Sequence, residues 1–379
     1  MTAKLHQFIV RTALVAACAN AMLYCQTGGA TKPQPDILIF SDGEKLIGQL
    51  KSAKGDSVVF KSDMAGEITV AWSKIQELRT SRPFAVIGKN AKLAKHSDVS
   101  QVPQGPVVMT DQKIAVQAAG AAPRTVPVAE AGFVVAQPEF EKAIDHEGSF
   151  FEDWGGMVTA GASLVQATQV ARTFTGGVSL MRAEPAETWL NPSNRTLLDF
   201  SASYGKVSQP GLPNIKTAIF HGDAEEDKYF SPRAFGFGEA AFDHNYSQGL
   251  DLQQMYGGGL GFTAYKTAAA ELDVKAAVSY IHQSFSAGEV NQSLIGSTFA
   301  EIYTRKFKRG ILLNEQISAT PAWNNTRAYF ATGSVSLTLP VRKRLSVALA
   351  SLDTFLNDPP PGFRKNSFQF TAGLSYLLK

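Results

Sequence analysis

The sequence predicts an all-β fold: an antiparallel transmembrane β-barrel of about 12 strands over residues 148–379, preceded by a small SH3-like β module. Two observations predict the barrel. Apolar and polar residues alternate in runs that exceed the roughly five or six residues of a sandwich strand and suit the about nine to eleven residues that cross a bilayer. Aromatic residues are also concentrated from residue 148 onward, as the interfacial girdles of such barrels require.

The composition excludes several other classes of protein. The 379 residues carry a formal net charge of +3, and no nucleic-acid partner is expected because such binding needs a concentrated basic face. A mean hydropathy of −0.07 and the lack of a long apolar run after the N-terminus exclude a polytopic helical membrane protein. A hydrophobic share of 44% excludes a largely disordered chain.

Residues 1–30 are predicted to be a secretory signal peptide and the start of the mature chain. Lys4 and Arg11 precede a short apolar run, and 19–21 (ANA) is a candidate cleavage site. The competing interpretations are a lipoprotein signal acylated at Cys18 and an ordinary buried helix. Cys18 lies within this leader and Cys25 beside it, so the mature chain retains at most one cysteine and cannot form an internal disulfide.

Residues 31–95 are predicted to form a periplasmic SH3-like module, and residues 96–147 a linker with further β-like strands. Asp42-Gly43 and other glycine-containing turns supply the positive φ that tight hairpins need. The alternating runs between these turns cover residues 37–40, 46–50, 58–60 and 68–72. A spacer or docking role is favoured over catalysis for this module.

The barrel is predicted from twelve alternating runs. With an even number of strands, the chain enters and leaves the barrel on the same side of the membrane. This is the periplasmic side, where the N-terminal module would then lie. Charges at mid-run on the polar faces, such as Asp199, Lys275 and Glu315, suit a wet lumen better than a dry core. The runs are 154–165, 171–183, 194–207, 214–224, 232–246, 249–265, 268–284, 292–307, 310–321, 326–340, 342–355 and 365–379.

The glycine-rich stretch 257–261 (GGGLG) resembles a phosphate-binding loop, but a strand and not a helix follows it. We expect these glycines to relieve curvature and to accept a neighbouring ring across the sheet. The aromatic residues expected in the interfacial girdles are Trp154, Tyr204, Phe235, Tyr265, Tyr280 and Tyr376.

A family resemblance supports the barrel. The segments 233–239 (RAFGFGE), 242–252 (FDHNYSQGLDL), 257–262 and 359–376 resemble the signature of the YdiY-like family of salt-induced outer-membrane proteins, whose activity is unknown. This resemblance implies a bacterial outer-membrane barrel and no known substrate. The chain's end also resembles the C-terminal signal read by the barrel-assembly machinery, although Lys379 stands where such barrels usually end on an aromatic residue. The candidate signal residues are Thr371, Gly373, Tyr376 and Leu378.

No catalytic, cofactor-binding or metal-binding residue is predicted. His282 and Ser284 have the spacing of the His-x-Ser of outer-membrane phospholipase A, but a histidine at a strand end is the favoured interpretation. The acidic stretch 223–227 (DAEED) is taken as a solvated loop or turn rather than a cation site. The basic clusters 305–309 (RKFKR) and 342–344 (RKR) are either solvated turns or contacts to lipid phosphates or anionic saccharide headgroups.

The function expected from the sequence is therefore that of a non-enzymatic outer-membrane barrel, either related to envelope stress or a narrow channel for small solutes. Its expected partners are outer-membrane lipid and, during biogenesis, the barrel-assembly machinery; no cofactor is expected. Two alternatives remain open at this point. One is an outer-membrane hydrolase of the phospholipase kind, and the other is a soluble periplasmic β-sandwich that binds a ligand.

Overall fold

The computed structural model describes residues 34–117, 120, 122–145, 148–166, 170–208, 213–286 and 291–378, so the predicted signal peptide lies outside the described residues. The chain divides into two compact units. The N-terminal unit contains the residues up to 90 together with 100–138, and the C-terminal unit contains 91–99 and 139–379. Within the described segments, no helix is long and apolar enough to cross a membrane.

The N-terminal unit is a nine-stranded sheet with the path β4-β3-β2-β1-β5-β6-β7-β8, and β9 pairs with both β2 and β5. Because β1 also pairs with β2 and β5, these four strands close into a small barrel of the predicted SH3-like kind. The strands are β1 (Asp36–Phe40), β2 (Lys45–Lys54), β3 (Ser57–Ser62), β4 (Gly66–Ala71), β5 (Ile75–Gly88), β6 (Gln104–Thr110), β7 (Lys113–Val116), β8 (Arg124–Pro127) and β9 (Ala131–Ala136).

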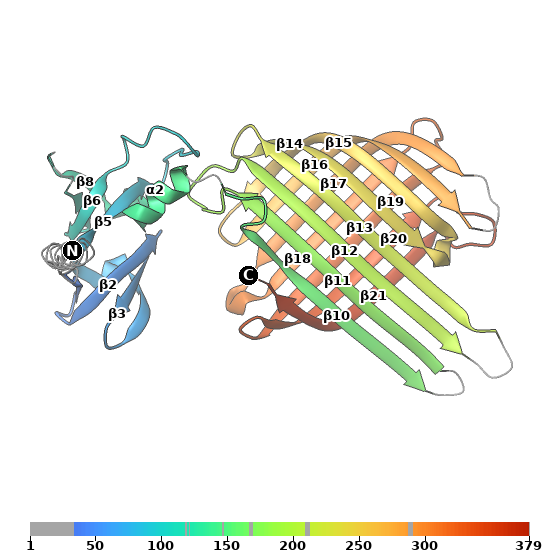
Figure 1. Ribbon diagram of the computed structural model, residues 1–379, viewed down its shortest axis with the longest axis horizontal. Helices are drawn as coiled ribbons and strands as arrows, with labels where there is room; N and C mark the ends of the chain where they lie inside the picture. The colour runs from blue at the N-terminus through green and yellow to red at the C-terminus, as the bar shows by residue number, and fades with distance from the viewer. Residues whose placement is uncertain are drawn as a thin grey trace, which may run out of the picture. The chain divides into compact units, whose positions relative to one another are not determined.

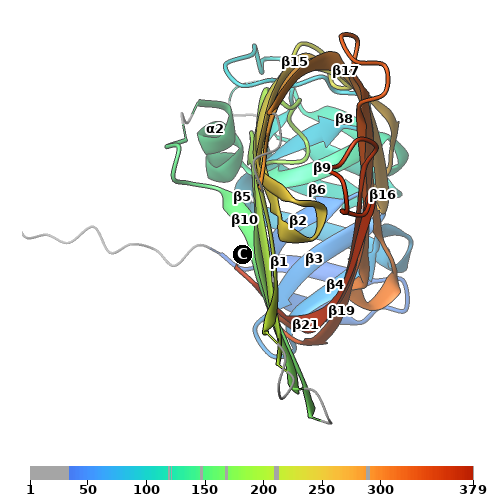
Figure 2. The ribbon, with the colours of Figure 1, turned by 90° about the vertical axis from the view of Figure 1, so that its right-hand side faces the viewer.

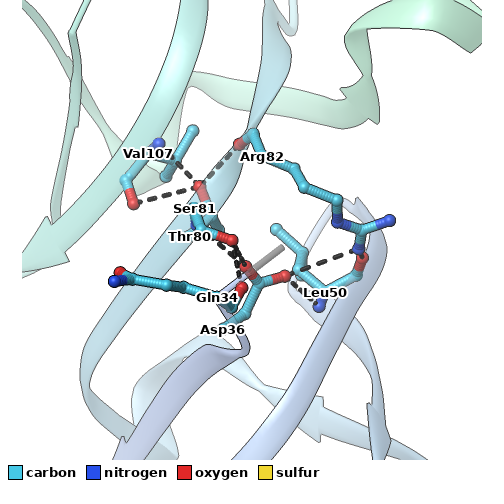
Figure 3. Close-up of polar contacts among 7 residues, drawn as sticks. All are labelled: Gln34, Asp36, Leu50, Thr80, Ser81, Arg82 and Val107. Atoms are coloured by element: carbon cyan, nitrogen blue, oxygen red, sulfur yellow. Dashed lines mark hydrogen bonds and ion pairs between the residues drawn. The ribbon is translucent and has the colours of Figure 1, made fainter. Parts of the chain in front are cut away.

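A buried carboxylate joins three strands of this unit (Figure 3). Asp36 is 1% exposed, and its two oxygens accept hydrogen bonds from the backbone N–H groups of Leu50 at 2.8 Å and Ser81 at 2.9 Å. Arg82 lies 3.5 Å from the same carboxylate and donates to the Leu50 carbonyl at 2.8 Å. The pairing of β5 with β6 shifts register across 79–83. Asp36 therefore accepts a hydrogen bond from the Ser81 amide where the β5–β6 ladder is irregular.

Twelve antiparallel strands form a closed barrel in the C-terminal unit, and Figure 1 shows their tilt. Each strand falls on one of the predicted alternating runs. The strands are β10 (Trp154–Gln166), β11 (Val170–Glu184), β12 (Asn194–Ser208), β13 (Ile215–Tyr229), β14 (Ala234–Asn245), β15 (Leu250–Lys266), β16 (Ala270–Phe285), β17 (Gln292–Lys306), β18 (Leu312–Pro321), β19 (Tyr329–Arg342), β20 (Leu345–Leu356) and β21 (Asn366–Leu377). The closed ring excludes the soluble sandwich, which requires two separate packed sheets.

The barrel closes where β10 meets β21, and four residue pairs from Met157–Leu377 to Ala160–Leu374 define the seam. The next pair in this register is Gly161 opposite Gly373. A Cβ atom on Gly373 would lie 2.5 Å from the Ala160 carbonyl oxygen, and one on Gly161 would lie 2.7 Å from the Ala372 carbonyl oxygen. The seam therefore requires glycine at both positions. We call the end where β10 begins and β21 ends the near end, and the opposite end the far end.

Outward-facing side chains make an apolar belt around the barrel. The ring of strands itself is flattened in the view of Figure 2. Such a belt is the surface that hydrocarbon requires, because lipid offers no partner to polar groups. Prominent exposed members are Phe174, Phe200, Phe220, Phe242, Leu260, Val278, Phe299, Val335, Phe370 and Leu374.

Segments outside the ring pack on it at the near end. The helix α2 (Gln137–Asp145) places the Phe140 ring 5.2 Å from the Trp189 ring, in the β11–β12 connection. Lys95 also donates a 2.7 Å hydrogen bond from its Nζ to Glu184 Oε1 at the end of β11. These contacts fix the near-end rim of β11 and β12.

Candidate functional site

The lumen of the barrel carries a concentrated set of charged side chains on β12, β13, β14 and β16. Side chains of a strand alternate between its two faces, and each of these residues has the opposite phase from an exposed apolar neighbour such as Phe200, Phe220, Phe242 or Val274. We call the set the lumenal charged cluster. Its members are Arg195, Asp199, His221, Asp223, Glu225, Asp227, Glu239, Asp243, Asp273 and Lys275.

Arg195 and Lys275 make ionic contacts that cross the near-end lumen and join β12 and β13 to β16. Arg195 binds Asp227 on the adjacent strand at 2.6 Å and Asp273 on β16 at 2.8 Å. Lys275 on β16 meets Glu225 on β13 at 2.5 Å, with both side chains 6% exposed. Since β14 and β15 lie between β13 and β16 in the sheet, the Arg195–Asp273 and Lys275–Glu225 ion pairs bridge non-adjacent strands across the concave, lumenal side of the curved sheet.

Aromatic rings fill the space beneath these ion pairs, and the glycines of β15 make that space. Phe235 pairs with Gly261 and Phe237 pairs with Gly259 in the β14–β15 register. A Cβ atom on Gly261 would lie 2.2 Å from two atoms of the Phe235 ring. The Arg195 guanidinium lies over the Phe235 ring, 5.2 Å from its centroid. The expectation that the glycine-rich stretch accepts a neighbouring ring is therefore confirmed.

A chain of polar side chains crosses the middle of the same wall. His221 Nδ1 lies 2.7 Å from Asp243 Oδ1, and its Nε2 lies 3.0 Å from Asp223 Oδ1. Gln253 on β15 donates to Asp243 Oδ2 at 2.9 Å, and Gln283 on β16 donates to Gln253 at 2.7 Å. Because both acceptors facing the imidazole are carboxylates, both hydrogen bonds form only when each ring nitrogen carries a proton.

The cluster has more negative than positive charge. It contains seven carboxylates against Arg195, Lys275 and the imidazole of His221. Buried oxygens of Glu225, Asp227, Glu239 and Asp273 have no hydrogen-bond partner among the described residues. Such carboxylates attract cations and repel anions, most strongly where the surroundings exclude water.

The far-end mouth is spanned by the short turn η3 (Tyr246–Gln248) between β14 and β15. Gln248 is 1% exposed and donates hydrogen bonds to the carbonyls of Thr354 at 3.2 Å and Lys365 at 2.7 Å. Those acceptors lie on β20 and in the β20–β21 connection, about half the ring away. The glycine after the turn, Gly249, has a φ of +67° and packs against the Phe363 ring. The turn therefore ties opposite walls together.

Below this turn, apolar side chains from two walls meet inside the lumen. Leu250 pairs with Phe285 across β15 and β16, and Phe330 pairs with Leu356 across β19 and β20. All four are at least nine-tenths buried and pack as one cluster. Since β17 and β18 separate the two strand pairs, this contact narrows the passage at the far end.

The four candidate assembly-signal residues lie on or just after β21. Thr371 and Gly373 have the lumenal phase, whereas Tyr376 is 48% exposed on the outer face, and Leu378 follows the strand. Gly373 also belongs to the seam, so its presence has a structural reason. Recognition by the assembly machinery stays a prediction.

The structure does not pair the two residues expected of a hydrolase. His282 and Ser284 share the outer face, but His282 Nδ1 lies 3.0 Å from Ser293 Oγ on the neighbouring strand β17. In the described part of the chain, no hydrogen bond orients the Nε2 atom of this histidine. An orienting group is a part of serine-hydrolase sites, so the arrangement supports no hydrolytic role.

Three expectations from the sequence are corrected by the strand phases. The acidic stretch 223–227 is part of β13 and not a loop, because the alternation continues through it with Asp223, Glu225 and Asp227 facing the lumen. Phe235 is 0% exposed inside the barrel and does not belong to a girdle. Glu315 pairs with Val335, which is 42% exposed on the outer face, so its side chain faces outward and not into the lumen.

The main site residues missed in the sequence were Arg195, Glu239 and Asp273. Glu239 ends the family-signature segment 233–239, but no motif distinguishes Arg195 and Asp273 from ordinary strand charges. The in-phase spacing of His221, Asp223, Glu225 and Asp227 is the signal that would have placed the acidic stretch in the lumen. Among the described residues, no group of three or more potential ligands could hold a metal ion.

The family model described as "Protein of unknown function, DUF481" matches residues 158–377, which confirms the sequence resemblance at the family level. No curated protein matches the chain. The NanC porin structure is similar over 58% of this chain and 98% of that one, at 9% identity and a TM-score of 0.36. The beta domain of the Bordetella autotransporter BrkA covers 60% of this chain and 99% of its own, at 9% identity and 0.27. A Pseudomonas aeruginosa FadL homologue covers 90% and 86%, at 11% identity and 0.23.

Proposed function

The chain belongs to the DUF481 family of proteins of unknown function, and we propose that its barrel lies in a bacterial outer membrane and passes small solutes, with a preference for cations. A signal peptide at 1–30 would export the chain, and the barrel-assembly machinery would insert it. The even number of strands supports a periplasmic position for the N-terminal unit, since the chain enters the barrel at β10 and leaves it at β21 on the same side of the membrane.

The excess of carboxylates in the lumenal charged cluster carries this proposal. Its central members are accessible: the side chains of His221 and Asp223 are 33% and 30% exposed. Charges are expensive to place in a dry interior, so their partial exposure inside a closed ring favours a hydrated lumen. Fixed negative charge along such a lumen concentrates cations by the same rule that makes rings of Asp and Glu select cations in other pores.

The passage is narrow for two physical reasons. Barrels of few strands have interiors that are largely filled by side chains. Here the rings of Phe235 and Phe237 occupy the lumen beside β14, β15 and β16. At the far end the η3 turn and the apolar cluster around Leu250 and Phe330 connect opposite walls. Small hydrated ions and small polar solutes are therefore the expected cargo, and folded or bulky substrates are not.

Planar-bilayer conductance of the purified full-length protein tests the passage. We expect small, steady currents and, across a potassium chloride gradient, a reversal potential of the sign that cation preference gives. The double variant Asp199→Asn/Asp223→Asn should move that potential toward zero. Glu226→Gln is the matched control, because Glu226 lies on the same strand but faces outward. Absence of current, or a preference for anions, would refute the proposal.

The localisation is tested separately from conduction. We expect the protein in the detergent-resistant outer-membrane fraction, with a gel mobility that changes on heating. A protease added to intact cells should leave the N-terminal unit uncut, and should cut it once the outer membrane is permeabilised. Cleavage in intact cells would place the unit outside and overturn the orientation.

A further inference from the structure

Two hairpins at the near end join into one basic surface. The β17–β18 hairpin contributes Arg305 and Lys306 at the end of β17 and Lys308 and Arg309 in its connection. The β19–β20 hairpin contributes Arg342 at the end of β19 and Lys343 and Arg344 in its connection; all seven are exposed. We call these seven residues the basic collar. In the sequence its two parts are separated by more than thirty residues, so only the fold brings them together.

The strand register places the two hairpins side by side. Leu312, the first residue of β18, pairs with Thr338 on β19, which runs on past that pair to Arg342. The turn before β18 therefore lies along the last residues of β19. A Cβ atom on Gly310 would lie 3.4 Å from Pro340 Cγ, which confirms the contact between the hairpins.

Within the described segments, no acidic side chain neutralises the charges of the basic collar. No ion pair holds any of the seven among the residues that the structure describes. The nearest acids along these strands are Glu301 and Glu315, and the sequence has no Asp or Glu from 316 to 352. Arg305 lies over the Phe307 ring in a cation–π contact, with its guanidinium carbon 4.9 Å from the ring centroid. Seven cations on adjacent hairpins, with no acidic partner among the described residues, repel one another, so an anionic partner would stabilise them.

Exposed apolar side chains are interleaved with these cations. Phe307 is 41% exposed, Val341 is 64% exposed and Leu345 is 39% exposed. Tyr376, opposite Leu345 on β21, is 48% exposed on the same outer face. A surface of aromatic and aliphatic side chains mixed with Arg and Lys is suited to the boundary between hydrocarbon and headgroups, where one part of the surface is dry and the other is wet.

From this juxtaposition we propose that the basic collar binds the phosphodiester headgroups of anionic glycerophospholipids. The guanidinium groups of Arg305, Arg309, Arg342 and Arg344 present forked donors that match phosphate oxygens. The apolar side chains would contact the first carbons of the acyl chains. The collar thereby assigns the near end to the phospholipid leaflet of the membrane. This inference does not depend on whether the lumen conducts.

The experiment measures lipid retained by the full-length protein in detergent, using native mass spectrometry. It offers phosphatidylglycerol and phosphatidylcholine of identical acyl chains and, in a separate arm, lipid A. We expect preferential retention of phosphatidylglycerol by the wild type, and its release as salt is raised. Each Lys or Arg near an anionic surface contributes about fivefold to binding. Arg342→Gln/Lys343→Gln/Arg344→Gln should therefore lower retention on the order of 100-fold.

A matched control removes three cations from the far-end connections: Arg327→Gln/Arg364→Gln/Lys365→Gln. This control should retain phosphatidylglycerol as the wild type does, and both variants should keep the heat-modifiable mobility of a folded barrel. If the collar variant does not fold, the salt dependence of the wild type still decides. Equal retention of both lipids, equal loss in the control, or a preference of the collar for lipid A phosphates overturns the proposal.

Discussion

The fit between Phe235 and Gly261 yields the sharpest prediction about the lumen. In Gly261→Ala the new methyl carbon would lie 2.2 Å from Cε2 and Cζ of the Phe235 ring. The ring is 0% exposed and held under Arg195, so it cannot swing aside freely. Overpacking of this kind costs about 1–3 kcal/mol, and we expect a value in the upper half of that range.

The double-mutant cycle separates steric fit from simple loss of packing. Phe235→Ala alone should cost about 3–5 kcal/mol, because it leaves a cavity under the ion pairs. In the double variant the extra methyl enters that cavity, so the total should fall short of the sum of the single costs by about 2 kcal/mol. Gly238→Ala is the control: it lies on β14, and a Cβ there would meet no atom within 4 Å.

Equilibrium unfolding in urea measures these differences, with the protein folded into lipid vesicles, tryptophan fluorescence as the signal and heat-modifiable mobility as a check on the folded fraction. Two outcomes would refute the reasoning. Either the single costs add to within about 0.5 kcal/mol, or Gly261→Ala proves as harmless as Gly238→Ala.

Two further predictions address the N-terminal unit and the seam. Asp36→Ala removes a buried acceptor from two backbone amides and should destabilise the N-terminal unit by about 3 kcal/mol or more; limited proteolysis should cut that unit faster while the barrel's mobility is unchanged, and equal protease resistance would contradict this. Gly373→Val places side-chain atoms against the Ala160 carbonyl and should lower the temperature at which the folded band is lost, whereas Gly333→Val, at an open outward position, should not; identical melting of the two variants would count against the seam.

The alternation of side chains determined most of the barrel from the sequence alone. A strand has only two faces, so an apolar residue at every second position, as in Val274, Val278 and Tyr280, fixes which side chains share a face over its whole length. The length of the runs then separated a membrane barrel from a sandwich. The same alternation predicts His282 on the outer face of its strand, and the structure places it there.

The sequence interpretation failed where a local rule competed with that alternation. The charge of the acidic stretch 223–227 favours a loop, because charged side chains usually lie in solvent. The interior of a barrel also accepts charged side chains, and Asp223, Glu225 and Asp227 lie within a strand. The preference of aromatic residues for the membrane interface predicts Phe235 in a girdle, but Gly261 on the opposite strand leaves room for the ring inside the barrel.

Only the tertiary structure decided which side chains meet across the lumen. Arg195 and Asp273 are 78 residues apart, as distant along the chain as many pairs that never touch, and nothing in their local sequence links them. Their contact follows from the curvature of β12–β16 and from the stagger of the closed ring, which depend on all the strands together. Periodicity is a property of one strand and can therefore be recognised in the sequence. A contact between non-adjacent strands across the lumen depends on how all the strands close into the barrel.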